Sequence, residues 1–160
     1  MKKLTWEEVE SLTKNLANKI RESEFRPDYI IGITTGGLFP LGLVAKELKV
    51  KNILTATARS NNDNVHKEEV EILYIPQINL TNKNVLLIDD VTERGLTLYE
   101  VANAIKKTCK PKVLKTATIA MDINKCKHSP DYYAIKQETD WVVFPWEKEK
   151  FGPYAVGKRE

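Results

Sequence analysis

The sequence has few cysteines, no long apolar run and only a small excess of charge, and each of these features argues against a class of protein. The two cysteines, Cys109 and Cys126, are far apart and lack CxxC spacing, so we expect free thiols in a reducing cytoplasm and no zinc site. The chain turns polar directly after Leu4, and no segment approaches the length of a membrane span, which predicts a cytoplasmic protein without a signal peptide or membrane contact. A net charge of +3 with interspersed signs argues against nucleic acid as a partner.

Apolar side chains make up 42% of the 160 residues, a fraction typical of a globular protein and not of a disordered one. No internal repeat, low-complexity tract or linker divides the sequence. We therefore expect one domain spanning residues 1–160, long enough to bury a substantial core.

Short apolar runs alternate with segments of helical periodicity. Thr5 and Glu8 form a capping-box pattern, after which apolar residues recur at helical spacing. Strands that alternate with helices are typical of an α/β fold with a mainly parallel, twisted sheet flanked by helices. We predict helices at 6–21, 38–48 and 96–107, strands at 29–33, 53–58, 70–75, 84–88 and 113–120, short extended pieces at 132–135 and 141–144, and a polar surface loop at 59–66.

Two loops, after Ile33 and after Ile88, follow predicted parallel strands and precede predicted helices. Such sheets bind ligands at the carboxyl ends of their strands. Because right-handed crossovers bring these ends to one edge of the sheet, we expect the two loops to form one site.

The loop after Ile88 begins with two carboxylates, Asp89 and Asp90, held at the end of an apolar strand. The following strand-to-helix turn offers backbone N–H groups and the positive end of a helix, which suit a phosphate. Thr92 and Thr97 add hydroxyls, and Gly95 permits a close approach or a positive φ. For an isolated acid pair we would favour helix capping, but this order of elements favours a sugar phosphate, with the acids on its hydroxyls or on Mg²⁺.

Residues 85–98 (VLLIDDVTERGLTL) resemble the phosphoribosyl pyrophosphate (PRPP) motif of type I phosphoribosyltransferases. The resemblance implies that Asp89 and Asp90 are the catalytic acids, which bind the ribose hydroxyls and Mg²⁺. It also implies that Arg94 stands where the family usually has threonine, either paired with the phosphate or pointing to solvent. The residues implied to bind the 5′-phosphate are Thr92, Glu93, Arg94, Gly95, Leu96 and Thr97.

The loop after Ile33 resembles the family's pyrophosphate loop, and residues 36–48 resemble those of xanthine–guanine phosphoribosyltransferases. On its own, a glycine pair between a strand and a helix is explained more often by packing than by binding. Thr35 replaces an arginine that is common in the family, so Mg²⁺, Lys46 or a lysine in the 60s would have to compensate for the missing charge. The residues implied to bind pyrophosphate are Thr34, Thr35, Gly36 and Gly37.

Residues 138–147 resemble the hood segment of 6-oxopurine enzymes, which implies a small C-terminal hood formed mainly by 121–160. The implied base-binding residues are Trp141, by stacking, and Val142, whereas we expect Trp146 to pack the tail against the sheet. Met121 stands where the family presents a lysine to the base, and Lys125 or Lys127 could replace it.

The resemblance implies a Mg²⁺-dependent transfer of ribose 5-phosphate from PRPP to a purine base, with release of pyrophosphate, in purine salvage. The base would be guanine, xanthine or hypoxanthine, the segment 59–67 would close over the substrates, and the protein would be a homodimer or homotetramer. A non-catalytic PRPP- or nucleotide-binding regulator of the same fold is the alternative. A phosphoacceptor receiver domain is disfavoured because Ile33 is not followed by acids. We assign no catalytic role to His66 or His128 and expect Lys67 to be solvated.

Overall fold

Six strands form one sheet in the order β4-β3-β2-β5-β6-β7, and only the edge strand β4 runs antiparallel to its neighbour. The computed structural model describes residues 1–61, 69–138 and 141–150. The helices are α1 (Trp6–Glu22), α2 (Leu38–Leu48), α3 (Leu96–Cys109) and a 3-10 helix (Pro145–Lys150). The strands are β1 (Lys2–Lys3), β2 (Tyr29–Thr34), β3 (Ile53–Asn61), β4 (Glu69–Tyr74), β5 (Asn84–Thr92), β6 (Val113–Asp122), β7 (Tyr132–Gln137) and β8 (Val142–Val143). The predicted α/β fold with a mainly parallel sheet is thereby confirmed.

The start of α1 shows how the local sequence determines where a helix begins. The Glu8 N–H donates to the Thr5 hydroxyl over 3.1 Å, and the Thr5 N–H donates to the Glu8 carboxylate over 2.8 Å. This reciprocal capping box satisfies two backbone donors that a helix start leaves unpaired. The predicted beginning of the helix at residue 6 is confirmed.

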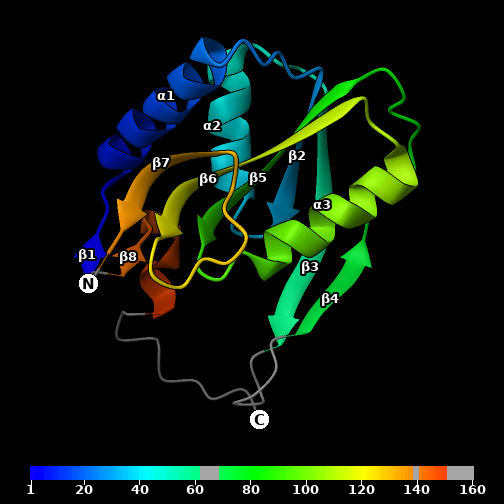
Figure 1. Ribbon diagram of the computed structural model, residues 1–160. Coiled ribbons are helices and arrows are strands. Elements are labelled where there is room, and N and C mark those ends of the chain that lie inside the picture. The colour runs from blue at the N-terminus through cyan, green and yellow to red at the C-terminus, as the bar shows by residue number, and fades with distance from the viewer. Residues whose placement is uncertain (62–68, 139–140, 151–160) are drawn as a thin grey trace.

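The sheet has a buried core on each face, because successive side chains of a strand point to opposite sides. In β5, Val85 and Leu87 pack with α3, whereas Leu86 and Ile88 pack with α1 and α2. Figure 1 shows α3 on one side of the sheet and the pair α1 and α2 on the other. The strand that carries the predicted acids is thus fixed from both faces.

Strands β2 and β5 are direct parallel neighbours, with Gly32 paired to Ile88. The loops that follow them therefore leave the sheet at the same edge, as the crossover argument predicted. Asp89 and Asp90 still belong to β5, which continues to Thr92. The predicted boundary at Ile88 was wrong because the first polar residues of the motif remain paired, Asp89 with Thr118 of β6.

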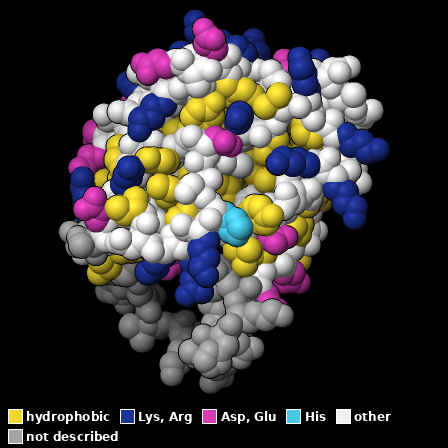
Figure 2. Space-filling model, in the orientation of Figure 1, with side chains coloured by type: hydrophobic (Ala, Val, Ile, Leu, Met, Phe, Trp, Pro, Cys, Tyr) yellow, Lys and Arg dark blue, Asp and Glu magenta, His cyan; other side chains and the backbone are white. Residues whose placement is uncertain are grey.

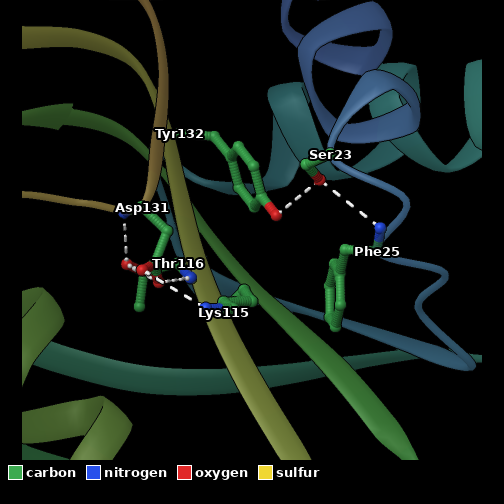
Figure 3. A network of polar contacts seen from close by, with 6 residues as sticks. All are labelled: Ser23, Phe25, Lys115, Thr116, Asp131 and Tyr132. Carbon is green, nitrogen blue, oxygen red and sulfur yellow. Dashed lines mark hydrogen bonds and ion pairs between the residues drawn. The ribbon is translucent and has the colours of Figure 1, made fainter.

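A network of polar contacts fastens the beginnings of β6 and β7 to each other and to the end of α1 (Figure 3). Asp131 accepts hydrogen bonds from the Thr116 N–H and hydroxyl, over 2.8 and 3.1 Å, and Lys115 lies 4.0 Å from its other oxygen. The hydroxyl groups of Tyr132 and Ser23 lie 2.8 Å apart. Strand β7 lies within the predicted hood at 121–160, but it is an edge strand of the main sheet.

The part that stands apart from the main sheet is a small assembly near the N-terminus, where β1 pairs with β8. Its ring stack places Trp146 against Phe39 of α2 and Phe144, with centroid distances of 4.5 and 4.6 Å, and Trp6 lies 5.7 Å from Trp146. Trp146 also packs against the buried cluster that contains Ile119 and Ala120 of β6, so the prediction that it packs the tail against the sheet is confirmed.

The surface that α3 covers shows Lys and Arg side chains scattered among Asp, Glu and apolar ones, without an extended basic patch (Figure 2). None of the helices in the described part of the chain is long and apolar enough to span a membrane. Both cysteines are free thiols, and the buried Cys109 donates to the Pro76 carbonyl over 3.1 Å.

Candidate active site

A cavity opens at the tip of β5, beside the first turn of α3. The end of β3 and the residue before β8 complete its wall. The lining residues are Ser60, Asp89, Val91, Thr92, Glu93, Arg94, Gly95, Leu96, Thr97, Leu98 and Trp141. The structure thus brings the six residues predicted to bind the 5′-phosphate together with one predicted acid and with Trp141, the predicted stacking residue. Ser60 was missed because it lies far away in sequence, in a segment assigned to a polar loop.

Asp89 points toward the α3 face and into this cavity. Its Oδ1 accepts the N–H of Asp90 over 2.9 Å. Burial raises the pKa of the Asp89 carboxyl well above its usual range, and the neighbouring charge of Asp90 raises it further. A carboxylate held in this way is stabilised by any hydroxyl or cation that enters the cavity.

Asp90 points to the opposite face of β5 and packs against the glycine loop that follows β2. A Cβ added to Gly36 would collide with both oxygens of this carboxylate. Asp90 Oδ1 accepts the Val91 N–H over 2.7 Å. Burial raises the pKa of Asp90, and the hydrogen bond from Val91 opposes that effect. The two acids therefore contact different regions: Asp89 lines the cavity, and Asp90 packs against the glycine loop.

Trp146 is a further neighbour of Asp90 that the sequence did not indicate. Its side chain lowers the pKa of the Asp90 carboxyl, while Glu147 raises it. The indole N–H of Trp146 is buried and forms no hydrogen bond of ordinary geometry within the described residues. The aromatic stack thus extends to the acid pair, a contact between residues 56 positions apart that no local pattern reveals.

The segment between β5 and α3 has the geometry of an anion site. Gly95 has a φ of 86°, in the left-handed region that favours glycine, and α3 begins at the next residue. The helix start directs backbone N–H groups and partial positive charge toward the cavity. The Thr92 side chain is buried beside this segment, and its hydroxyl has no hydrogen-bond partner in the described part of the chain.

The loop after β2, at residues 34–37, is packed more tightly. Thr34 donates from its hydroxyl to Thr57 of β3 over 2.9 Å. The Gly37 N–H donates to the Ile33 carbonyl over 2.8 Å, and a Cβ at Gly37 would lie 2.5 Å from that carbonyl oxygen and 2.8 Å from the one of Ile88. Gly37 is therefore required for packing, and its N–H is already occupied within the protein.

Two lysines were candidates to replace cationic side chains that the family has and this chain lacks: Lys46 for the one missing at Thr35, and Lys125 for the one missing at Met121. Lys46 lies in the last turn of α2, about 12 Å along the helix axis from the first residue, so the suggestion that it compensates for Thr35 was wrong. Lys125 forms an ion pair with Glu93 over 2.8 Å, and this contact brings it to the rim of the cavity. Met121 is buried.

On the predicted base side, the structure separates the two candidates. Trp141 lines the cavity, and its carbonyl accepts the Lys2 N–H over 2.9 Å. Val142 is buried in the pairing of β8 with β1. Of the two candidates, only Trp141 borders the cavity, and its carbonyl is already engaged.

Most of the predicted lid at 59–67 lies outside the described residues, as do His66 and Lys67. Its first three residues were assigned wrongly, because 59–61 extend β3 and pair with β4. Polar side chains contribute to this pairing: the Arg59 guanidinium donates a hydrogen bond to the Glu71 carboxylate on the neighbouring strand over 3.0 Å. A polar strand at the end of a sheet has no apolar alternation by which to recognise it.

The fold is that of an α/β domain with a cavity at the carboxyl ends of its strands, which is where such sheets bind their ligands. The phosphoribosyl transferase domain family matches residues 4–149. The chain therefore belongs to the phosphoribosyl transferase domain family, as a type I member close to the 6-oxopurine enzymes.

Individual relatives agree over nearly the full length. A xanthine-guanine phosphoribosyltransferase of Desulfotalea psychrophila is 28% identical over 158 residues, covering 98% of this chain and 93% of the relative. The solved structure of a purine phosphoribosyltransferase from Pyrococcus horikoshii is 34% identical, with a TM-score of 0.78 and coverage of 91% and 92%. A Helicobacter pylori xanthine-guanine-hypoxanthine phosphoribosyltransferase shares the fold at 16% identity, with a TM-score of 0.75 and coverage of 91% and 92%.

Proposed function

We propose that this protein is a purine phosphoribosyltransferase that transfers the ribose 5-phosphate of PRPP to a 6-oxopurine and releases pyrophosphate, as in purine salvage. One observation carries the proposal: Asp89 and the anion-binding segment 92–97 line the same cavity. A ribose 5-phosphate has hydroxyls for the acid at one end and a phosphate for the helix start at the other. The names of two curated relatives and of one similar solved structure support a purine as acceptor.

In the proposed reaction a nitrogen of the base forms a bond to the anomeric carbon and gives up its proton, as the bond to pyrophosphate breaks and pyrophosphate leaves with the electron pair. Positive charge develops on the sugar in the transition state, and the carboxylate of Asp89 offers negative potential beside it. Segment 92–97 holds the phosphate end, so the reacting carbon is fixed between two anchors on one rigid strand and helix. Both anchors act through groups that are in place before the substrate arrives.

Mg²⁺ is the metal that the family resemblance implies, and the residues fit it in their donor chemistry. Asp89 and Asp90 supply the hard carboxylate oxygens that this ion prefers, and burial disfavours their charge in the absence of a cation. The resemblance implies that both acids hold the ion, but the two carboxylates face opposite sides of β5. We therefore propose that Asp89, which lines the cavity, holds it. When bound, it would neutralise negative charge on the leaving pyrophosphate.

For pyrophosphate we propose the loop at 34–37, with Asp90 beside Gly36. The N–H of Gly37 is occupied, so backbone donors for the ligand would come from the earlier residues of the loop. For the base we propose stacking on Trp141, whose ring suits a flat heterocycle. Cytoplasmic location and a homodimer or homotetramer stay predictions of the family resemblance.

A product assay tests the proposal. The protein is incubated with PRPP and Mg²⁺ and, separately, with guanine, hypoxanthine, xanthine or adenine, and the products are separated for nucleotide. We expect nucleotide from at least one 6-oxopurine and none from adenine. Protein with Asp89→Asn and Asp90→Asn, purified in the same way, controls for contaminating enzymes.

The same experiment addresses the alternative of a non-catalytic regulator. Thr35 favours that alternative, because the loop at 34–37 carries no cationic side chain. Calorimetric binding of PRPP without nucleotide from any of the four bases would establish a PRPP-binding protein and overturn the proposed activity.

A further inference from the structure

The connection between β6 and β7, residues 123–131, packs against the back of the segment proposed to bind phosphate. The Lys127 and His128 N–H groups both donate to the Arg94 carbonyl, over 3.0 and 3.4 Å. None of the residues of this connection lines the cavity. Apart from Lys125, which its ion pair with Glu93 brings to the rim, the connection therefore contacts the phosphate segment from outside, and its effect on a ligand would have to pass through that segment.

These hydrogen bonds fix the direction of one peptide group. In a trans peptide the C=O and the following N–H point in opposite directions. With the Arg94 carbonyl directed to Lys127 and His128, the Gly95 N–H is directed away from the connection. Arg94 and Gly95 both line the cavity, so this orientation presents a donor on the cavity side.

His128 makes two further contacts with the start of α3. Its carbonyl oxygen occupies the space in which a Cβ of Gly95 would stand. Its imidazole stacks on the ring of Tyr99, with centroids 4.1 Å apart and an angle of 19° between the planes. The Tyr99 N–H in turn donates to the Gly95 carbonyl over 3.0 Å, so His128 touches both ends of the first helical turn.

The connection is itself anchored at both ends. At its start, the Asp122 carboxylate accepts the N–H groups of Asn124 and Lys125, over 2.9 and 3.1 Å. At its end, Asp131 and Thr116 exchange three hydrogen bonds, of 2.8, 3.1 and 3.0 Å, which Figure 3 shows at the beginning of β6. A segment held in this way resists displacement and can hold its neighbour.

We infer that the β6–β7 connection is a positioning element of the phosphate site, in which His128, stacked on Tyr99, keeps the Arg94–Gly95 peptide turned with its N–H toward the cavity. The inference rests on the proposed function, because it takes the ligand to be the phosphate end of PRPP. His128 does not touch the cavity and is a positioning residue, not a catalytic one.

The test is binding of ribose 5-phosphate by calorimetry, together with steady-state kinetics. His128→Ala and Tyr99→Ala each remove the stack and leave the backbone donors, and we expect either change to weaken ribose 5-phosphate binding up to about tenfold. The KM for PRPP should rise by a similar factor, with the KM for the base unchanged. Tyr99→Phe keeps the stacked ring and should restore wild-type binding.

Asn103→Ala is the matched control, since Asn103 lies one turn further along α3 and borders the same surface hollow as Tyr99 and His128. It should bind ribose 5-phosphate like the wild type, and thermal melts of all four variants check that they fold. If the wild type binds ribose 5-phosphate and both alanine variants of the stack bind it equally well, the inference is wrong while the proposed function stands. If the wild type binds neither ribose 5-phosphate nor PRPP, the proposed function fails and the inference falls with it.

Discussion

The two loops that join β2 to α2 and β5 to α3 look alike in sequence but differ in structure. Each leaves the same edge of the sheet and carries threonine and glycine before a helix. At the first, Gly37 has a φ of −67° and is enclosed by two backbone carbonyls. At the second, Gly95 has a φ of 86° and borders an open cavity.

The difference shows that a glycine before a helix has at least two uses. Gly37 is required for space, because α2 begins in close contact with β2 and β5. Gly95 is required for its backbone conformation and because the carbonyl of His128 approaches it closely. Only the second arrangement leaves a helix start open toward a cavity, so we place the tighter anion grip there.

The largest expected effect comes from the acid pair that joins the two segments. Asp89→Asn with Asp90→Asn should lower kcat by about a thousandfold or more, because the change removes the negative potential beside the developing sugar cation. The measurement is nucleotide formation at saturating PRPP and base. Turnover close to the wild-type value would show that the acids are not at the ribose.

The single variants sharpen the comparison between the segments. Since Asp89 faces the cavity and Asp90 faces Gly36, we expect Asp89→Asn to weaken binding of ribose 5-phosphate and Asp90→Asn to weaken product inhibition by pyrophosphate. Equal effects of both variants on both ligands would contradict the division of roles.

The second effect concerns stability at the packed loop. Gly37→Ala places a methyl group against the backbone oxygens of Ile33 and Ile88, which cannot rotate away. We expect a loss of about 3 kcal/mol in the free energy of unfolding, as for other overpacked positions. Urea unfolding followed by circular dichroism gives the value.

Gly36→Ala is the matched neighbour of that change. Its methyl group would meet the carboxylate of Asp90, a side chain that can move. We expect a smaller loss of stability than for Gly37→Ala but a clear loss of turnover. If both variants lost stability equally with activity intact, the loop would be a packing element only.

The loops after β2 and β5 show which features of the site could be predicted from the sequence. The alternation of apolar strands with periodic helices predicted which strands the two loops follow, and the crossover rule predicted that both loops lie at the same edge of the sheet. The end of β5 was predicted too early, and the direct pairing of β2 with β5 was not predicted. The site residues around β5 are close in sequence, so a local pattern could bring them together. What remained hidden depends on distant contacts: Trp146 with Asp90, Lys125 with Glu93, and Ser60 at the cavity.

The third expected effect is a pH dependence of stability. Burial raises the pKa of Asp89 above its ordinary value, so between the two values the folded state binds more protons than the unfolded state. Stability from this group therefore rises as the pH falls from neutral through the folded-state pKa. Asp89→Asn should raise the melting temperature by a few degrees at pH 7, and the gain should shrink toward pH 4. A variant that melts lower than the wild type at pH 7 would contradict the cost assigned to this buried charge.

The smallest effect is expected at Gly42, which tests whether the crowding at Gly36 and Gly37 is local to the loop. Gly42 lies inside α2. Apart from its chain neighbours and the nearby backbone of its own helix, no heavy atom of the described residues lies within 4 Å of the position that a Cβ would take. Alanine loses less backbone freedom than glycine on folding into a helix, so Gly42→Ala should stabilise the protein by about 0.5–1 kcal/mol. Turnover should be unchanged, because the substitution leaves the loop and the start of α2 in place. Urea unfolding of Gly42→Ala and Gly37→Ala side by side provides the direct contrast. A methyl group added inside α2 should stabilise the protein, and one added at the residue before α2 should destabilise it. A destabilising Gly42→Ala would mean that α2 is closely packed along its length, and the distinction between a crowded loop and an open helix would be lost.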